Sequence, residues 1–136
     1  MPGSRNSKAG SALDRVFIFL GSTAAWVGVG LGAFGAHGLR EKLSEPMMAV
    51  YQTAVQYHLI HALGLILIGC IVQGSPQTPL LQAAGWLLLA GILLFSGSLY
   101  GLTLTEIHGF GLITPFGGLC LLAGWALLAL GIWKQP

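Results

Sequence analysis

The amino-acid sequence predicts an all-α fold, an integral membrane four-helix bundle, and three observations support this prediction. Of the 136 residues, 54% are hydrophobic and only 7% are charged, whereas soluble domains carry roughly 25% charged residues. The mean hydropathy of the chain is +0.78. The apolar residues also gather into four runs, each close to the roughly 20 residues that a helix needs to cross a bilayer. We therefore expect most of the protein surface to face lipid.

Four spans are expected within one transmembrane domain over residues 16–134. Their approximate limits are 16–37, 54–73, 80–102 and 113–133. Residues 1–15 are small and polar, and we expect them to form a flexible N-terminal lead. The first apolar run is long for the core of a cleaved signal peptide, which has about 7–15 residues, so we expect it to remain as a membrane anchor.

Two of the spans follow a recognisable helix start. Ser44 precedes Glu45 and Pro46, and Thr114 precedes Pro115. A serine or threonine side chain can cap the free N–H groups at a helix start, and proline is tolerated in the first turn because its missing N–H would have no partner there. These patterns predict a helix that leads into the second span from the preceding loop, and a fourth span that begins near Thr114.

The small residues and the cysteines are interpreted as packing residues. Ala24, Gly28 and Gly32 recur at every fourth position of the first span, a pattern typical of helices whose backbones approach closely. Cys70 and Cys120 each lie within an apolar run, so we expect no disulfide framework.

An even number of spans places both termini on one side of the membrane. Four basic residues lie on that side: Arg5, Lys8, Arg15 and Lys134. Two basic residues, Arg40 and Lys42, lie in the loop on the opposite side. Because cytoplasmic loops carry the excess of lysine and arginine, we expect both termini to be cytoplasmic.

Composition and motifs argue against several classes of function. The formal net charge is +2, and no basic patch with interleaved aromatic residues is present, so we expect no nucleic-acid partner. The sequence has no nucleophile elbow, phosphate-binding loop or pair of carboxylates, and we expect no enzyme. It identifies no cofactor. The expected partners are membrane lipid and either a second copy of the chain or another membrane protein.

Polar side chains gather in the half of the molecule opposite the termini. Tyr57, His58 and His61 lie at the head of the second apolar run. His61 follows Tyr57 by four positions and His58 by three, so it neighbours both on the surface of a helix. An ionisable group inside a span is a candidate functional residue, because charge is costly there. Counted from Ala54 at about 1.5 Å per residue, His61 lies roughly 10 Å inside the polar boundary, which predicts a site near the outer leaflet. The candidate site residues are His37, Tyr57, His58, His61, Ser96, Ser98, Tyr100, Glu106, His108 and Thr114.

Several interpretations of this cluster stay open. In one, His58 and His61 only form hydrogen bonds between helices and fix their packing. In another, the cluster binds a lipid-like or quinone-like ligand, or a partner membrane protein, because His, Tyr and Ser beside glycines suit a polar headgroup with an apolar tail. A small oligomeric transporter is a further alternative, in which His61 takes the place of a mid-membrane carboxylate.

A haem or metal site is the last alternative. His58 and His61 could bind one metal from one helix face, with His37 or His108 as a third ligand. Bis-histidine haem would need two histidines on facing helices. Ligand-spaced cysteines are absent from the sequence and carboxylates are few, so no metal site is firmly predicted.

Four motifs, in this order, resemble a known family. They are GAFGAHGL at 32–39, QTAVQYHLIHAL at 52–63, FSGSLY at 95–100 and ITPFGG at 113–118. With them the sequence, over residues 16–133, is similar to the YgdD-like small four-span membrane proteins grouped as domain of unknown function 423. The resemblance implies a four-helix membrane protein, in the inner or plasma membrane for a bacterial member. It implies no activity and no catalytic residues, although its motif positions coincide with the polar cluster.

Overall fold

The computed structural model describes the backbone of residues 4–75 and 78–136, and side chains from residue 12 onward within these ranges. All regular secondary structure in this part of the chain is helical. The elements are α1 (Ser4–His37), α2 (Glu45–Gly74), α3 (Pro79–Gly91), η1 (Ile92–Ser96), α4 (Gly97–Thr105), η2 (His108–Leu112) and α5 (Thr114–Trp133). The segment η1 is a π-helix that joins α3 to α4 without a break, and η2 is a short 3₁₀ helix.

Four helical stretches of the described chain are long and apolar enough to cross a membrane. They are Ala12–His37, Glu45–Gly74, Pro79–Thr105 and His108–Trp133. Each contains one of the four predicted spans and extends beyond it at one or both ends. The predicted all-α membrane bundle is confirmed.

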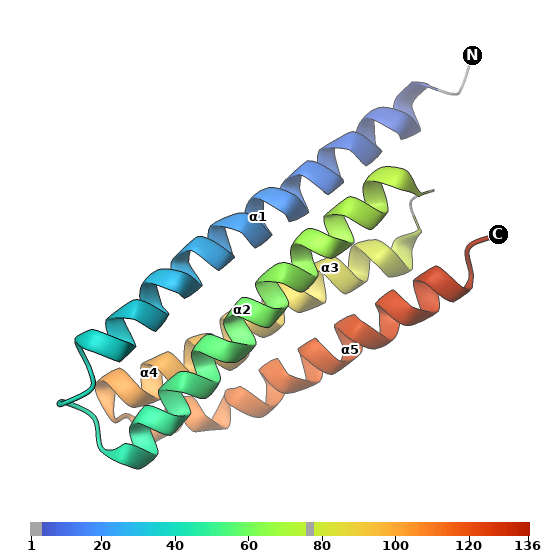
Figure 1. The fold of residues 1–136 in the computed structure, drawn as a ribbon. Helices are drawn as coiled ribbons and strands as arrows, with labels where there is room; N and C mark the ends of the chain where they lie inside the picture. Colours follow the sequence, from blue (N-terminus) through green and yellow to red (C-terminus); the bar gives the residue numbers. More distant parts are fainter. Residues whose placement is uncertain (1–3, 76–77) are drawn as a thin grey trace.

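The helices run up and down in a bundle, and the two chain ends lie at the same end of it (Figure 1). The end of α2 and the start of α3 lie at that end too, whereas the α1–α2 loop and η2 lie at the opposite end. Helix α1 packs mainly on α2, and α5 packs on the rod formed by α3 and η1. Helix α2 in turn packs on this rod and on α4.

Helix α1 begins earlier than the sequence indicated. Its backbone is helical from Ser4, whereas residues 1–15 were expected to form a lead outside the first span. Residues 1–3 and the side chains up to residue 11 lie outside the described residues. Asp14 is only 3% exposed and Phe17 is fully buried. The α1 backbone at Asp14 also lies directly against Gly69 of α2. Packing against the neighbouring helix therefore includes Asp14, just before the predicted start of the first span.

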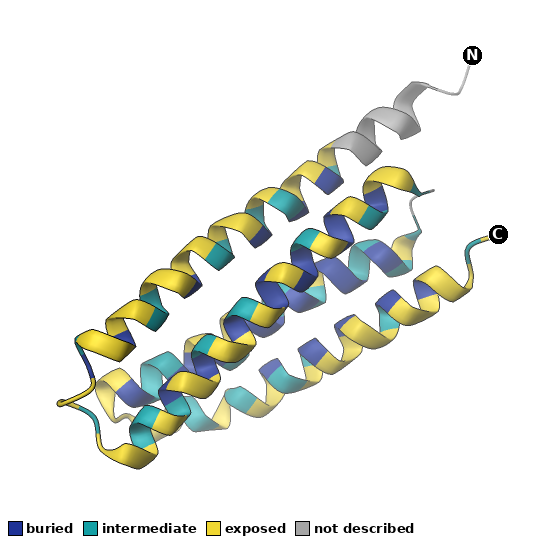
Figure 2. Ribbon diagram, viewed as in Figure 1, coloured by how far each residue is buried: buried dark blue, intermediate teal, exposed yellow. Residues whose placement is uncertain are grey.

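The apolar core lies in the half of the bundle that holds the termini. Buried residues lie on the inward side of the helices, while most outward positions are exposed (Figure 2). The core cluster is Phe17, Leu65, Ile68, Val72, Leu81, Ala84, Leu88, Leu121 and Leu128. Many large apolar side chains outside this cluster, such as Trp26 and Leu122, are exposed, as expected for a bundle with lipid around it.

Glycines set the closest approaches between helices. A Cβ at Gly28 would lie 2.7 Å from a side-chain carbon of Leu59, which confirms the packing role predicted for this position. The closest approach to another helix's backbone involves Gly117 of α5, where a Cβ would overlap the backbone of Leu94 and Phe95 in η1. Backbone cannot move aside as a flexible side chain can, so α5 lies against the π-helical segment only because residue 117 has no side chain.

Gly117→Ala is predicted to destabilise the bundle, because the added methyl group overlaps the η1 backbone. Overpacking of this kind costs about 1–3 kcal/mol. The neighbouring Gly118→Ala is the matched control, since a Cβ there would meet only the Phe95 ring at 3.8 Å, an ordinary contact. Both substitutions give the same gain in helix propensity. Thermal unfolding in detergent should show a loss for the first variant alone; equal midpoints for the two would contradict the close packing of α5 on η1.

Candidate functional site

The structure divides the predicted polar cluster into groups with different surroundings. Four side chains lie between helices and form hydrogen bonds there, which we call the interior bridge: Tyr51, His58, Ser96 and Tyr100. Tyr57 and His61 line a cleft on another side of α2. Ser98 and Thr114 contact each other. His37, Glu106 and His108 are exposed at the end of the bundle opposite the termini.

The interior bridge connects three helices through His58. Its Nδ1 lies 3.0 Å from the hydroxyl oxygen of Tyr100 on α4. The same imidazole hydrogen-bonds to the backbone of Ala24 on α1. The side chain is 6% exposed. Since both sides of the ring have protein partners, the geometry favours the packing interpretation for His58.

Two hydroxyl groups complete the interior bridge. The Tyr51 hydroxyl donates to the carbonyl of Leu31 on α1 at 2.6 Å, and the Ser96 hydroxyl donates to the carbonyl of Ala54 on α2 at 2.8 Å. Sequence reasoning did not include Tyr51 among the candidate residues. The signal was present, because Tyr51 precedes His58 by seven residues, two helical turns, and so shares its face.

The remaining polar candidates stabilise the far end of the bundle. The Ser98 and Thr114 hydroxyl oxygens are 2.6 Å apart and join α4 to the first turn of α5. Glu106 ends α4 with a positive φ of 58°, the one non-glycine residue with positive φ in the described chain. These roles belong to the ends of helices, and the structure does not place His37, Glu106 or His108 in the interior bridge or in the cleft.

The histidines do not converge on a metal. Within the described residues, no group of three or more His, Cys, Asp or Glu side chains could hold an ion. His58 faces α1 and α4, whereas His61 faces α5. The α1 residue beside the His58 ring is Gly28. His37 lies nine residues further along α1, a distance of roughly 14 Å. His58 and His61, although three residues apart, therefore lie in two separate environments.

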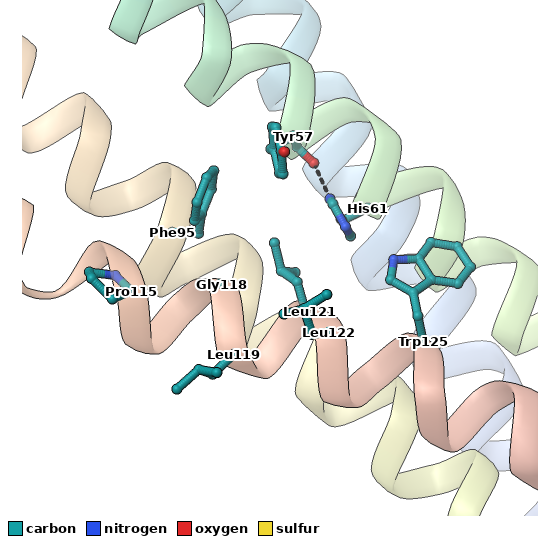
Figure 3. Close-up of a pocket in the computed structure, with 9 residues that line it drawn as sticks. All are labelled: Tyr57, His61, Phe95, Pro115, Gly118, Leu119, Leu121, Leu122 and Trp125. Atoms are coloured by element: carbon teal, nitrogen blue, oxygen red, sulfur yellow. Dashed lines mark hydrogen bonds between the residues drawn. The ribbon is translucent and has the colours of Figure 1, made fainter.

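The cleft lies between α2 and α5, with Phe95 of η1 contributing to its wall (Figure 3). Its volume is about 500 Å³. It is lined by Tyr57, His61, Phe95, Pro115, Gly118, Leu119, Leu121, Leu122 and Trp125. No lysine, arginine or carboxylate is among these residues, so its polar groups are a hydroxyl, an imidazole and an indole N–H.

The hydrogen bond of His61 determines which of its nitrogens carries hydrogen. Nδ1 lies 2.6 Å from the backbone carbonyl oxygen of Tyr57, one turn earlier in α2. A carbonyl oxygen can only accept, so Nδ1 is the donor and Nε2 of the neutral ring is the acceptor. The structure gives Nε2 no hydrogen-bond partner among the described residues, and Figure 3 shows the ring directed from α2 toward α5, between Leu121 and Trp125.

Aromatic rings surround this imidazole. The Tyr57 ring stacks on it with centroids 5.7 Å apart, and the Trp125 ring lies at 6.0 Å. Tyr57 also packs on Phe95 at 4.6 Å. Sequence reasoning did not identify Phe95 or Trp125 as site residues, and no local signal could have done so. Their position beside His61 depends on which helices become neighbours.

The cleft lies beside the middle part of α2. His61 follows Glu45, the first residue of α2, by 16 residues, which is about 24 Å of helix. The whole of α2 has 30 residues, or about 45 Å. His61 therefore lies near the middle of its helix.

Comparisons with known proteins place the chain among membrane proteins. The model of a family described as a protein of unknown function (DUF423) matches residues 31–118. The UPF0382 membrane protein SH2409 of Staphylococcus haemolyticus is 48% identical over 120 residues, 88% of this chain and 97% of that protein. The UPF0382 membrane protein YwdK of Bacillus subtilis is 45% identical, with coverage of 88% and 98%. No solved structure matches.

Tyr100→Phe is predicted to weaken the interior bridge, because it removes the hydroxyl that binds His58. Hydrogen bonds between membrane helices contribute about 0.6 kcal/mol on average and up to about 1.7 kcal/mol. Tyr57→Phe is the matched control, since no hydrogen bond of the Tyr57 hydroxyl is found within the described chain. Chemical unfolding in detergent should separate the two variants. A loss of stability in Tyr57→Phe as large as in Tyr100→Phe would contradict the assignment of the bridge.

Proposed function

Because the chain belongs to the DUF423 family of membrane proteins, whose function is unknown, we propose a function from the cleft: this integral membrane protein binds a lipid-like or quinone-like amphiphile between α2 and α5. The observation that carries the proposal is the unpartnered His61 Nε2 in an otherwise apolar, aromatic-lined cleft. Ligand sites commonly combine such a lining with a few oriented polar groups.

The size and position of the cleft support an amphiphile. A volume of about 500 Å³ falls within the roughly 300–1,000 Å³ of typical small-molecule sites. Leu119 and Leu122 on its rim are 63% and 70% exposed, so the cleft opens sideways, where a membrane protein faces lipid. A molecule with an apolar tail can enter from the bilayer without crossing a polar surface.

We propose that the protein lies in the inner or plasma membrane of a bacterium, with both termini in the cytoplasm. The membrane is proposed because the relatives are named as membrane proteins and come from bacteria. The orientation is proposed from the distribution of lysine and arginine. The cleft then lies toward the middle of the bilayer, on the side of Trp125 away from the C-terminus. A second copy of the chain or another membrane protein could cover its open side.

Native mass spectrometry of the protein, released from membranes in mild detergent, tests ligand binding. Gly118→Leu fills the cleft, because residue 118 lines it, and Gly97→Leu adds the same side chain where the glycine has open space. We expect an additional mass on the parent protein and on Gly97→Leu that is lost in Gly118→Leu. A bare parent protein, or equal retention by both variants, would contradict ligand binding in the cleft.

Single-cysteine labelling tests the orientation. In a background without Cys70 and Cys120, Lys42→Cys should react with a membrane-impermeant maleimide on intact spheroplasts. Gln135→Cys, at the other end of the bundle, should react only after the membrane is opened. The reverse pattern would show that the termini are outside.

A further inference from the structure

The hydrogen bonding of the cleft specifies the headgroup of its ligand more closely than its apolar lining does. We infer that the ligand is an uncharged amphiphile whose hydroxyl group donates to His61 Nε2, such as a quinol or a long-chain isoprenoid alcohol. This inference rests on the proposed binding of an amphiphile between α2 and α5. It adds the chemistry of the recognised group.

The first step concerns the direction of the hydrogen bond. The Tyr57 carbonyl holds the Nδ1 hydrogen at 2.6 Å, and it belongs to the backbone of the same helix, so it stays beside the ring whether or not a ligand is present. The neutral imidazole therefore presents an acceptor to the cleft and cannot present a donor there. A ligand that satisfies Nε2 must carry an O–H or N–H group.

The second step concerns the opposite wall. Figure 3 shows the indole nitrogen of Trp125 on the side of the ring that faces His61, and the two ring centroids are 6.0 Å apart. Indole N–H is a donor only. One wall thus offers an acceptor and the other a donor. A hydroxyl group can donate to Nε2 and accept from the indole, whereas a ketone, an ether or an oxidised quinone can only accept.

The third step excludes a charged headgroup. The residues that line the cleft include no lysine or arginine, and His61 lies about 24 Å along α2 from its start. Aspartate and glutamate are also absent from the lining, so a phosphate, carboxylate or ammonium group would lose its water there without gaining an opposite charge. A hydroxyl group has a much smaller desolvation cost, and it can reach the middle of a bilayer on an apolar chain.

Binding of matched ligands to the purified wild-type protein tests the inference. Geranylgeraniol, its methyl ether and geranylgeranyl phosphate differ only at the headgroup, and occupancy can be compared by native mass spectrometry in one detergent. We expect the alcohol to bind roughly tenfold or more tightly than the ether, because the ether leaves Nε2 without a donor. The phosphate should bind no better than the ether. A short-chain quinol and its oxidised quinone form a second pair, in which the quinol should bind more tightly because it carries the hydroxyl donor. Tighter binding of the quinol than of geranylgeraniol would identify an aromatic headgroup.

Two substitutions at His61 connect the preference to Nε2. In His61→Asn the amide lies near the place of Nδ1 and no group replaces Nε2, so the preference for alcohol over ether should disappear. In His61→Gln the amide reaches the place of Nε2 and can accept, so part of the preference should remain. The wild-type ligand series needs no variant and decides the question even if one of these proteins fails to fold.

The possible failures are distinguishable. If alcohol and ether bind equally to the wild type and Gly118→Leu abolishes both, the cleft binds amphiphiles but the hydroxyl inference is wrong. If the phosphate binds best, the inference is also wrong, and an anionic lipid is the ligand. If no ligand of either series binds, or Gly118→Leu has no effect on binding, the proposed function itself is wrong.

Discussion

The interior of a bilayer offers no water, so every polar group inside the membrane-spanning part of the chain needs a partner within the protein or in a ligand. The backbone meets this requirement by forming helices. The side chains meet it by reaching across to neighbouring helices, as Tyr51 does to the Leu31 carbonyl and His58 to the Tyr100 hydroxyl. One half of the bundle is consequently held by hydrogen bonds with defined geometry, and the half with the termini by apolar packing.

The π-helical segment explains why the polar half also contains a cleft. Helix α5 packs mainly on α3 and η1, and Gly117 lets its backbone lie directly against η1. Within η1, Phe95 lines the cleft while the adjacent Ser96 bonds to the Ala54 carbonyl on the interior side. Single π-helical turns inside α-helices are frequent at functional sites. Here η1 contributes to both features. Ser96 bonds it to α2, and Phe95 forms a wall of the cleft between α2 and α5.

The fold was predictable from the sequence because the signals for it are local. Apolar runs of the right length define the spans, and Ser44 with Pro46 marks the start of α2, where the Ser44 side chain accepts a hydrogen bond from the Met47 N–H. The start of α1 at Ser4 was not predicted, because residues 1–15 are small and polar, and the burial of Asp14 depends on which helices become neighbours. The division of the polar candidate residues between the interior bridge and the cleft was not predictable. Spacing along α2 places Tyr57, His58 and His61 near one another without saying which neighbouring helix each one faces.

His58 and His61 illustrate what the packing adds. They are the same residue type, three positions apart on one helix, and each is 6% exposed. The ring of His58 has partners on α1 and α4, so removing any one partner would leave a polar atom enclosed by protein. The ring of His61 has one partner, a carbonyl of its own helix, and its second nitrogen faces a cleft. Lipid acyl chains cannot donate a hydrogen bond to that nitrogen. An acceptor held at this depth therefore costs free energy unless a hydroxyl group, from a ligand or from water that accompanies one, occupies the cleft beside it.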